Sequence, residues 1–262
     1  MALRFSIITI VKNGAAEIAQ TMQSVLNQEV KPWEYLILDG LSGDGTVEIV
    51  RKMEEQFAAA GIRLRVESAA DHGIYDAMNK GIAKAEGDVI GILNCGDWYD
   101  PCAIREAEAA LTGNAGTGAH GVSADDGQRG ADLVFGNIEL HRADGSIIRK
   151  KARLRRYQTS RDWNHPTMFV RARLYKENPF CCKGIHDDYA FYLKMVKQPV
   201  RIVTVDKTMA HFRMGGASNR KDFAAARRRI RDRYRYCYRA NGYSRFYLAE
   251  CIAIEAAKMI LG

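Results

Sequence analysis

The sequence predicts an α/β fold, built on a mixed, mostly parallel sheet with helices on both faces. In the first half, short β-branched runs alternate with longer segments in which apolar residues recur at helical spacing. Strands that alternate with helices form parallel sheets covered on both faces. After about residue 130 a hairpin pattern interrupts this alternation, so part of the sheet is antiparallel. With 262 residues and 47% hydrophobic content, the chain can bury a full core.

Strands and helices follow one another regularly in the first half. Apolar, β-branched runs predict strands at residues 5–11, 34–38, 64–67 and 89–93. Apolar residues at helical spacing predict helices at 15–28, 46–60 and 74–85. Pro101 suits the first turn of a further helix, which runs to about residue 111.

The second half changes character. Residues 113–130 are rich in Gly, Ala and Ser, which predicts a mobile surface loop. A strand at 133–140 precedes the turn ADGS at 143–146, a hairpin signal. We predict helices at 171–177 and 188–197 and a strand at 200–205. From about residue 222 the pattern is helical, with one face formed by Phe223, Ile230, Tyr234 and Tyr238.

Positive charge is concentrated near the C-terminus. The net charge is +8, and residues 220–239 hold nine Lys or Arg against two Asp, an excess of seven. A second basic cluster spans residues 149–156. Three interpretations are open: a solvated face, attraction to anionic lipid, or nucleic-acid binding. Base-stacking and groove-reading elements are missing, so we expect no nucleic-acid partner. We predict a main domain at 1–218 and a basic, amphipathic helical extension at 219–262, suited to an anionic membrane surface.

Composition argues against several other classes of protein. No apolar run approaches the ~20 residues that a membrane span needs. The N-terminus lacks the length and the cleavage site of a secretory signal. The six cysteines form no CxxC pair, which argues against a zinc site and a disulfide framework. We therefore predict a cytoplasmic protein with a peripheral role at the inner face of the membrane.

Three polar segments are expected to meet at one edge of the sheet. Residues 11–13, 39–46 and 94–97 each follow a predicted strand. In open α/β sheets, ligands bind beyond the carboxyl ends of the strands. The loop DGLSGDGT at 39–46 fits neither a phosphate-binding GK[ST] loop, nor GxGxxG, nor a calcium-binding EF-hand. Turn chemistry and helix capping remain the alternative explanation for that loop.

A series of motifs in fixed order points to a known family. The first are SIITIVKNG, SVLNQ, YLILDGLSGDGT, DHGIYDAMNKGIAKAEGDVIGILN and GDWYDP. Further along the chain come VFGNIEL, HPTMFVRARLY, GIHDDYAFYLKM and FRMGGAS. Together they resemble a family 2 glycosyltransferase with the GT-A fold, of the bacterial exopolysaccharide and lipopolysaccharide type. The resemblance covers residues 4 to 218.

The resemblance implies a nucleotide-sugar donor beneath the ends of the first strands. The turn that includes Thr9, Val11 and Asn13 would line the base. Asp39 would contact the base or ribose, and Asp71 would be a further carboxylate on the nucleotide side. Asn94 and Cys95, at the end of the fourth strand, would complete the donor site.

The resemblance also implies a divalent ion, Mg²⁺ or Mn²⁺, on the donor diphosphate. The family usually holds this ion with carboxylates of a DxD segment, yet here the segment reads Asn94-Cys95-Gly96-Asp97. Asp97 is the remaining carboxylate, and His211 is the expected histidine ligand. An Asn carbonyl and one carboxylate offer the hard oxygen ligands that such ions prefer. The alternative is that cationic side chains neutralise the diphosphate.

The segment HDDY at 186–189 lies where the family places its catalytic base. Asp188 aligns with the base and Asp187 with its acidic neighbour, although both could simply favour a helix N-terminus. The implied reaction is inverting transfer of a sugar to a hydroxyl of a glycan acceptor, which we expect to be lipid-linked. His165 and His186 could bind the acceptor or be structural.

Two rival functions remain open. A nucleotidyltransferase would want a Gly-rich, basic phosphate loop near the N-terminus, where VKNG offers only Lys12. A nucleotide-sugar-binding or scaffold protein with a decayed site would explain the missing DxD carboxylates.

Overall fold

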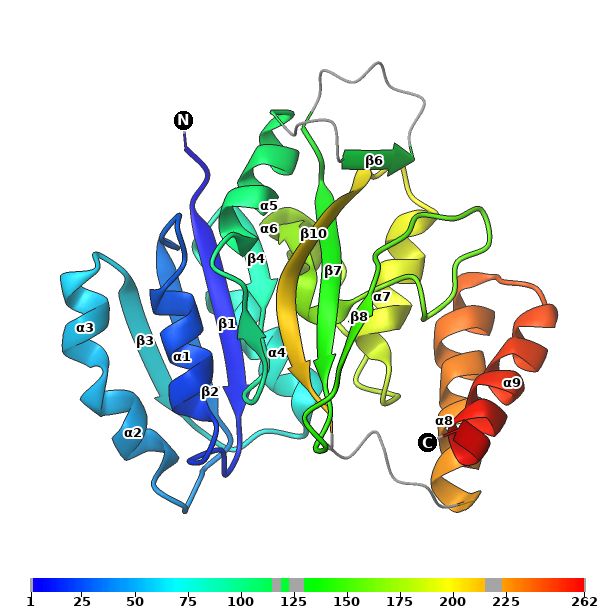
Figure 1. Ribbon diagram of the computed structural model, residues 1–262, viewed down its shortest axis with the longest axis horizontal. Helices are drawn as coiled ribbons and strands as arrows, with labels where there is room; N and C mark the ends of the chain where they lie inside the picture. Colours follow the sequence, from blue (N-terminus) through cyan, green and yellow to red (C-terminus); the bar gives the residue numbers. More distant parts are fainter. Residues whose placement is uncertain (1, 115–118, 123–129, 215–222, 262) are drawn as a thin grey trace.

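The structure, a computed structural model, is an α/β fold around one mixed sheet of ten strands (Figure 1). It describes residues 2–114, 119–122, 130–214 and 223–261. The strands are β1 (Phe5–Val11), β2 (Glu34–Asp39), β3 (Arg63–Ser68), β4 (Val89–Ile92), β5 (Trp98–Tyr99), β6 (Ala119–Val122), β7 (Leu133–His141), β8 (Ile147–Lys150), β9 (Phe169–Arg171) and β10 (Ile202–Arg213). Their order is β3-β2-β1-β4-β9-β7-β10-β5, with β6 paired to β10 and β8 to β7.

Pairing within the sheet is mixed, as predicted. β1 pairs in parallel with β2 and β4, β2 with β3, and β7 with β10. β9 is antiparallel to both β4 and β7, and the short β5 is antiparallel to β10. Every residue of β1 is buried, as expected for a central strand covered on both faces.

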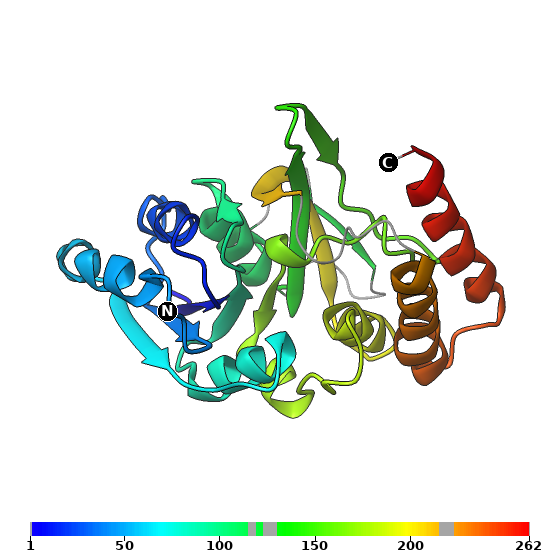
Figure 2. The ribbon, with the colours of Figure 1, turned by 90° about the horizontal axis from the view of Figure 1, so that it is seen from below.

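Helices cover both faces of the sheet (Figures 1 and 2). They are α1 (Ile18–Leu26), α2 (Thr46–Lys52), α3 (Glu54–Ala59), α4 (Ile74–Lys84), α5 (Ala103–Thr112), α6 (Ala172–Glu177), α7 (Asp187–Val196), α8 (Phe223–Asp232) and α9 (Phe246–Leu261). One hydrophobic cluster lies under α1, α2, α3 and α5, and the other under α4, α6 and α7. None of the helices among the described residues is long and apolar enough to cross a membrane.

Gly81 explains how α4 packs against the sheet. A Cβ atom at this position would lie 2.7 Å from a side-chain carbon of Ile8 on β1. Glycine costs helix stability, but here it lets the helix backbone approach the central strand closely. The close approach carries the first turn of α4 to the carboxyl edge of the sheet.

The structure differs from the sequence prediction in several places. The helix expected at 46–60 is divided at Met53 into α2 and α3. The strand expected at 200–205 runs on to Arg213, and β6 lies inside the expected loop at 113–130. The remainder of that prediction, at 115–118 and 123–129, lies outside the described residues. The short strands β5 and β9 were not predicted, because runs of two or three residues show no periodicity.

The C-terminal helices pack on the same core as α7. Cys237, Tyr238 and Cys251 are fully buried within that hydrophobic cluster. The hydroxyl of Tyr238 lies 3.1 Å from that of Tyr189 on α7. Phe223, predicted to share a face with Ile230, Tyr234 and Tyr238, is 83% exposed. The segment after residue 222 is therefore attached through buried contacts rather than by a few surface residues.

Two arginines of the basic cluster are buried. Arg229 donates to Glu255 of α9 at 2.7 Å, and Arg233 lies 3.5 Å from the same carboxylate. All three side chains are at most 5% exposed. A buried charge needs such a partner, since removing one member leaves the other uncompensated. Part of the C-terminal basicity thus holds α8 against α9.

Candidate active site

The ends of β1 and β4 form a pocket with the first turn of α4. The pocket has a volume of about 360 Å³ and is lined by Ile10, Val11, Lys12, Asn13, Gly14, Glu17, Asp71, Gly73, Ile74, Ala77, Asn94 and Cys95. Residues from three distant parts of the sequence meet here, at the carboxyl edge where the sheet topology predicts a ligand site. We call it the donor pocket.

Backbone conformation at Asn13 and Gly40 shapes the rim of the donor pocket. Asn13 has a left-handed backbone with φ +53°, and its side-chain oxygen accepts from the Gly43 N–H at 3.0 Å. A Cβ atom at Gly40 would lie 2.7 Å from a carboxyl oxygen of Asp71. Glycine therefore lets the loop after β2 approach Asp71, whose other oxygen accepts from the Gly73 N–H at 2.9 Å. The rim is held in place before a ligand binds.

Asp39 and Asn94 offer buried acceptors without partners. Asp39 is 3% exposed, and one oxygen accepts from the Ser42 N–H and the Ser68 hydroxyl. Within the described part of the chain, its other oxygen and the side-chain oxygen of Asn94 have no hydrogen-bond partner. Buried polar atoms are normally paired, so unpaired oxygens in or beside a pocket are suited to accept a hydrogen bond from a bound ligand. Asp39 itself is not a lining residue; its neighbour Gly40 approaches the lining residues Lys12 and Asp71.

The other predicted donor residues fall into two groups. Val11, Asn13, Asp71, Asn94 and Cys95 all line the donor pocket. Thr9 does not: it is fully buried, and its hydroxyl lies 2.8 Å from the Tyr35 hydroxyl and 2.7 Å from the Leu93 carbonyl. The structure brings the first group together and leaves Thr9 with a packing role beneath it.

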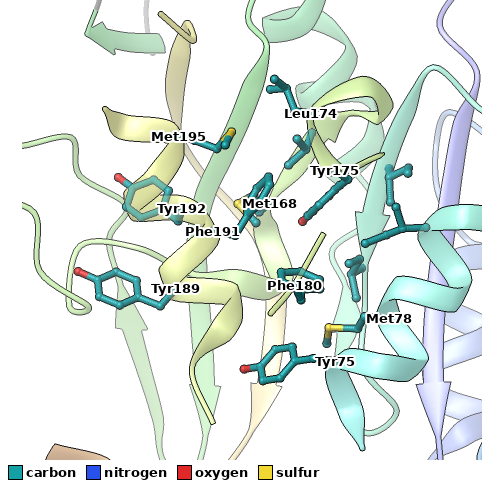
Figure 3. Close-up of a cluster of buried hydrophobic side chains, with 14 of the residues drawn as sticks. Tyr75, Met78, Met168, Leu174, Tyr175, Phe180, Tyr189, Phe191, Tyr192 and Met195 are labelled. Atoms are coloured by element: carbon teal, nitrogen blue, oxygen red, sulfur yellow. The ribbon is translucent and has the colours of Figure 1, made fainter. Parts of the chain in front are cut away.

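Asp188 lies at the start of α7 and is connected to α4. One carboxyl oxygen accepts from the Tyr75 hydroxyl at 2.8 Å and from the Tyr189 N–H at 2.9 Å. The other lies 3.5 Å from Nδ1 of His165. Figure 3 shows Tyr75 beside Phe180 at one end of an aromatic cluster to which α7 contributes Tyr189 and Phe191. This packing fixes the position of the Tyr75 ring.

Asp187 has a different environment from its neighbour. It is buried, and its two oxygens accept from the backbone N–H groups of Lys183 and Gly184, each at 3.0 Å. Burial raises the pKa of Asp187, and those two bonds oppose the rise. The side chain is fully used in holding the loop before α7, whereas Asp188 keeps 18% of its side chain exposed.

Asp188 has two partners that the sequence did not assign to it. Tyr75 was missed, and His165 was left as either an acceptor-binding or a structural residue. Tyr75 was visible only as an aromatic residue in the first turn of a predicted helix. His165 is 8% exposed, and neither ring nitrogen has a hydrogen-bond partner among the described residues. Burial lowers the pKa of His165, so its neutral form is favoured next to Asp188. His186, the other histidine, precedes α7 and has its ring nitrogen 3.4 Å from Arg233.

Among the described residues, Asp97 and His211 do not belong to one group of metal-ligating side chains. Asp97 is 5% exposed, and burial raises its pKa to about 8, although the Arg213 backbone N–H opposes the rise. His211 pairs in register with Trp98, and their rings stack at 5.3 Å. His211 instead lies beside Glu139 and His141.

A second, larger pocket is lined in part by Asp187. It has a volume of about 600 Å³ and lies between the segment at 178–183, α7 and residues 235–241. Its lining includes the cations Lys183, Lys194, Arg235 and Arg239 and the aromatic rings of Phe180 and Phe191. We call it the basic pocket. Its combination of cations and apolar walls suits an anionic group attached to an apolar one.

Comparison with known proteins identifies the family. The model of the family described as Glycosyl transferase family 2 matches residues 6–190. An uncharacterised glycosyltransferase of Mycobacterium tuberculosis is 36% identical over 110 residues, which are 41% of this chain and 40% of the relative. A PGL/p-HBAD biosynthesis glycosyltransferase of Mycobacterium bovis is 31% identical over 134 residues, 51% of this chain and 46% of the relative. The chain thus spans less than half the length of these curated relatives.

Two solved structures share the fold of this chain. S. aureus TarS 1–349, in complex with UDP-GlcNAc, aligns with a TM-score of 0.58 at 16% identity, over 99% of this chain and 73% of that one. The mannosyltransferase PcManGT from Pyrobaculum calidifontis, in complex with GDP-Man and Mn²⁺, aligns with a TM-score of 0.63 at 14% identity, over 100% and 75%. At these identities the likeness concerns the fold, which is GT-A as predicted.

Proposed function

The chain belongs to glycosyl transferase family 2, and from this we propose that it moves a sugar from a nucleotide-sugar donor to a hydroxyl of a glycan acceptor. The observation that carries the proposal is the first turn of α4. Its residues Gly73, Ile74 and Ala77 line the donor pocket, while Tyr75 between them donates to Asp188. One helical turn thus links the donor pocket to the carboxylate that best suits a general base.

The proposed reaction is a single displacement with inversion. The acceptor oxygen attacks the anomeric carbon while the bond from that carbon to the diphosphate oxygen breaks. Asp188 takes the proton of the attacking hydroxyl, and the nucleoside diphosphate leaves. Tyr75 and the Tyr189 N–H hold one carboxyl oxygen, which leaves the other, next to His165, for the proton. Asp187 supports the loop and does not take part directly.

A divalent ion, Mg²⁺ or Mn²⁺, would neutralise charge on the leaving diphosphate. The mannosyltransferase PcManGT was solved in complex with both GDP-Man and Mn²⁺, which supports this part of the proposal. The lost carboxylates at Asn94 and Gly96 are the observation in favour of the rival, a decayed binding protein. The Tyr75–Asp188 hydrogen bond argues against decay, since a binding protein needs no base.

We propose that the acceptor is lipid-linked and that the protein works at the inner, anionic face of a membrane. Four cations and three aromatic rings line the basic pocket, which fits a phosphate on an apolar chain. Phe246 is 85% exposed and Ile252 is 50% exposed on α9, beside the basic surface of α8. Exposed apolar side chains next to cations are typical of helices that lie on a membrane surface.

Calorimetric titration of UDP, GDP and dTDP, each with and without Mn²⁺, tests the proposal. We expect one nucleotide to bind, and Asp39→Asn to weaken that binding about tenfold, because the free oxygen of Asp39 accepts from the base or ribose. Ser68→Ala is the matched control, since it removes another partner of Asp39 and should leave the affinity within about twofold. Failure of all three nucleotides to bind would overturn the donor assignment.

A further inference from the structure

Three metal-ligating side chains gather at the carboxyl ends of β7 and β10. Glu139 and His141 come from β7 and His211 from β10, and all are partly exposed. The parallel register pairs His211 with Glu139, and His141 is two residues further along β7, on the same face. One ligand atom from each lies within 4.8 Å of the others. The sheet register, rather than a single loop, therefore builds this cluster.

The distances within the cluster fit ligands of one ion. Nδ1 of His211 lies 3.1 Å from Nε2 of His141 and 3.5 Å from a carboxyl oxygen of Glu139. Two ligand atoms that each lie about 2.1 Å from an ion are separated by roughly 3.0–3.4 Å at octahedral to tetrahedral angles. Small rotations of the side chains would bring all three donors to bonding distance.

Neighbouring residues hold the His211 ring in place. Its Nε2 lies 3.8 Å from a carboxyl oxygen of Asp100, and the Trp98 ring stacks on it at an interplanar angle of 10°. The His141 ring lies 4.7 Å from the same tryptophan. A metal-binding histidine usually directs its second nitrogen to a carboxylate, which fixes the ring and increases its basicity. Asp100 is suited to this supporting role.

We propose that Glu139, His141 and His211 form a site for a divalent transition-metal ion, which replaces the lost DxD carboxylates. Two imidazoles and one carboxylate favour Mn²⁺ or Zn²⁺ over Mg²⁺, which prefers oxygen ligands. The partial exposure of all three residues leaves positions open for water or for diphosphate oxygens. The site itself stands on geometry, and only its action on a diphosphate rests on the proposed function.

The proposal also accounts for the turn at residues 94–97. Gly96 has φ +96°, and a Cβ there would lie 3.1 Å from a carboxyl oxygen of Glu17. The adjacent Asp97 is buried and is not part of the cluster. With the ion held by β7 and β10, the turn has no need of metal ligands and is free to adopt this glycine conformation.

Metal binding by the full-length, metal-free protein tests the site without any assay of activity. Mn²⁺, Zn²⁺ and Mg²⁺ are titrated by calorimetry, and electron spin-echo spectroscopy of bound Mn²⁺ detects imidazole nitrogen. We expect one Mn²⁺ per chain with nitrogen coupling, and weaker binding of Mg²⁺. His141→Ala and Glu139→Gln should each weaken Mn²⁺ binding at least tenfold, with the nitrogen signal reduced in His141→Ala.

Two variants serve as matched controls. Asp97→Asn removes the carboxylate of the DxD segment, and Asp144→Asn removes a carboxylate that accepts from Ser146 in the β7–β8 hairpin. Both should bind Mn²⁺ within twofold of the unchanged protein, and circular dichroism checks that every variant is folded. Absence of Mn²⁺ and Zn²⁺ binding, or of nitrogen coupling, would overturn the proposal. It would also be overturned if Asp97→Asn lowered the Mn²⁺ affinity as much as His141→Ala does.

Nucleotide titrations separate this inference from the proposed function. If a nucleotide binds but the cluster binds no ion, the metal site is wrong and the donor assignment stands. If the cluster binds an ion but no nucleotide binds, the site stands and the sugar-transfer proposal fails.

Discussion

Asp187 and Asp188 are chemically identical neighbours that the fold uses differently. Asp187 is buried against two backbone N–H groups, whereas Asp188 faces Tyr75 and His165. The sequence shows two carboxylates at a helix start, and the family motif favours the second as the base. The partner on α4 is 113 residues away along the chain, so no local pattern could show it. The two roles differ because the two side chains have different hydrogen-bond partners, and only the folded chain shows these partners.

Gly96→Asp tests whether the departure from DxD is decay or adaptation. We expect this variant to lose stability and nucleotide binding rather than gain metal-dependent activity. The positive φ is unfavourable for a residue with a Cβ, and the new carboxylate would approach that of Glu17. Thermal melting and calorimetry measure the two effects, with a destabilisation of about 1–3 kcal/mol. A gain in metal-dependent sugar transfer would instead support the decayed-site interpretation.

At the scale of elements, most strands were predictable and their contacts were not. Long apolar runs indicated β1, β2 and β4, because buried parallel strands are apolar throughout. The polar residues at alternate positions in IELH, Ile138 to His141, were a signal that a strand presents Glu139 and His141 on one face. Pairing with β10, which brings in His211, depends on register and could not be read from the sequence.

Glu34 lies at the opposite end of β2 from the donor pocket and is expected to affect stability alone. It accepts from Ser6, from the Glu86 N–H and from Arg63. Burial would raise the pKa of Glu34, but these bonds and the Arg63 charge lower it overall from 4.5. A lowered pKa means that this stabilisation is present above pH 4.5 and is lost as the pH falls through the folded-state pKa.

Glu34→Gln should therefore lower the free energy of unfolding by about 1–3 kcal/mol at pH 7, with a smaller difference at acid pH. Denaturant unfolding of both proteins at a series of pH values from neutral to acid measures this difference in the free energy of unfolding. The difference should begin to shrink at about pH 5. Nucleotide affinity at neutral pH should be unchanged. A difference between the two proteins that is constant with pH would contradict the assigned ionic role.

At the scale of the whole molecule, the C-terminal helices serve both packing and surface charge. The sequence indicated a separate basic extension, but it could not show that Tyr238 and Cys251 complete the core beside α7. Removing everything after residue 218 should therefore give an insoluble protein rather than one that has only lost membrane affinity. Point changes at exposed arginines are the better test of the membrane proposal.

Arg235→Ser with Arg239→Ser should weaken binding to vesicles that contain anionic lipid. Each exposed cation near such a surface adds about 1 kcal/mol, so the double variant should bind about ten- to thirtyfold more weakly. Arg51→Ser with Lys52→Ser is the matched control, because α2 lies at the opposite side of the molecule from α8 and α9 (Figure 1). Co-sedimentation at low and high salt measures the difference. Equal losses in both double variants would show that net charge alone is responsible.

The most direct test of the central claim is to compare sugar transfer and donor binding in the unchanged protein and in Asp188→Asn. Release of nucleoside diphosphate from the nucleotide sugar identified by titration is followed with a lipid extract as acceptor. We predict that Asp188→Asn lowers the rate by about 10²–10⁴-fold and leaves donor affinity within about twofold. A variant that keeps its rate, or that loses donor binding as strongly as transfer, would contradict the role of Asp188 as the base.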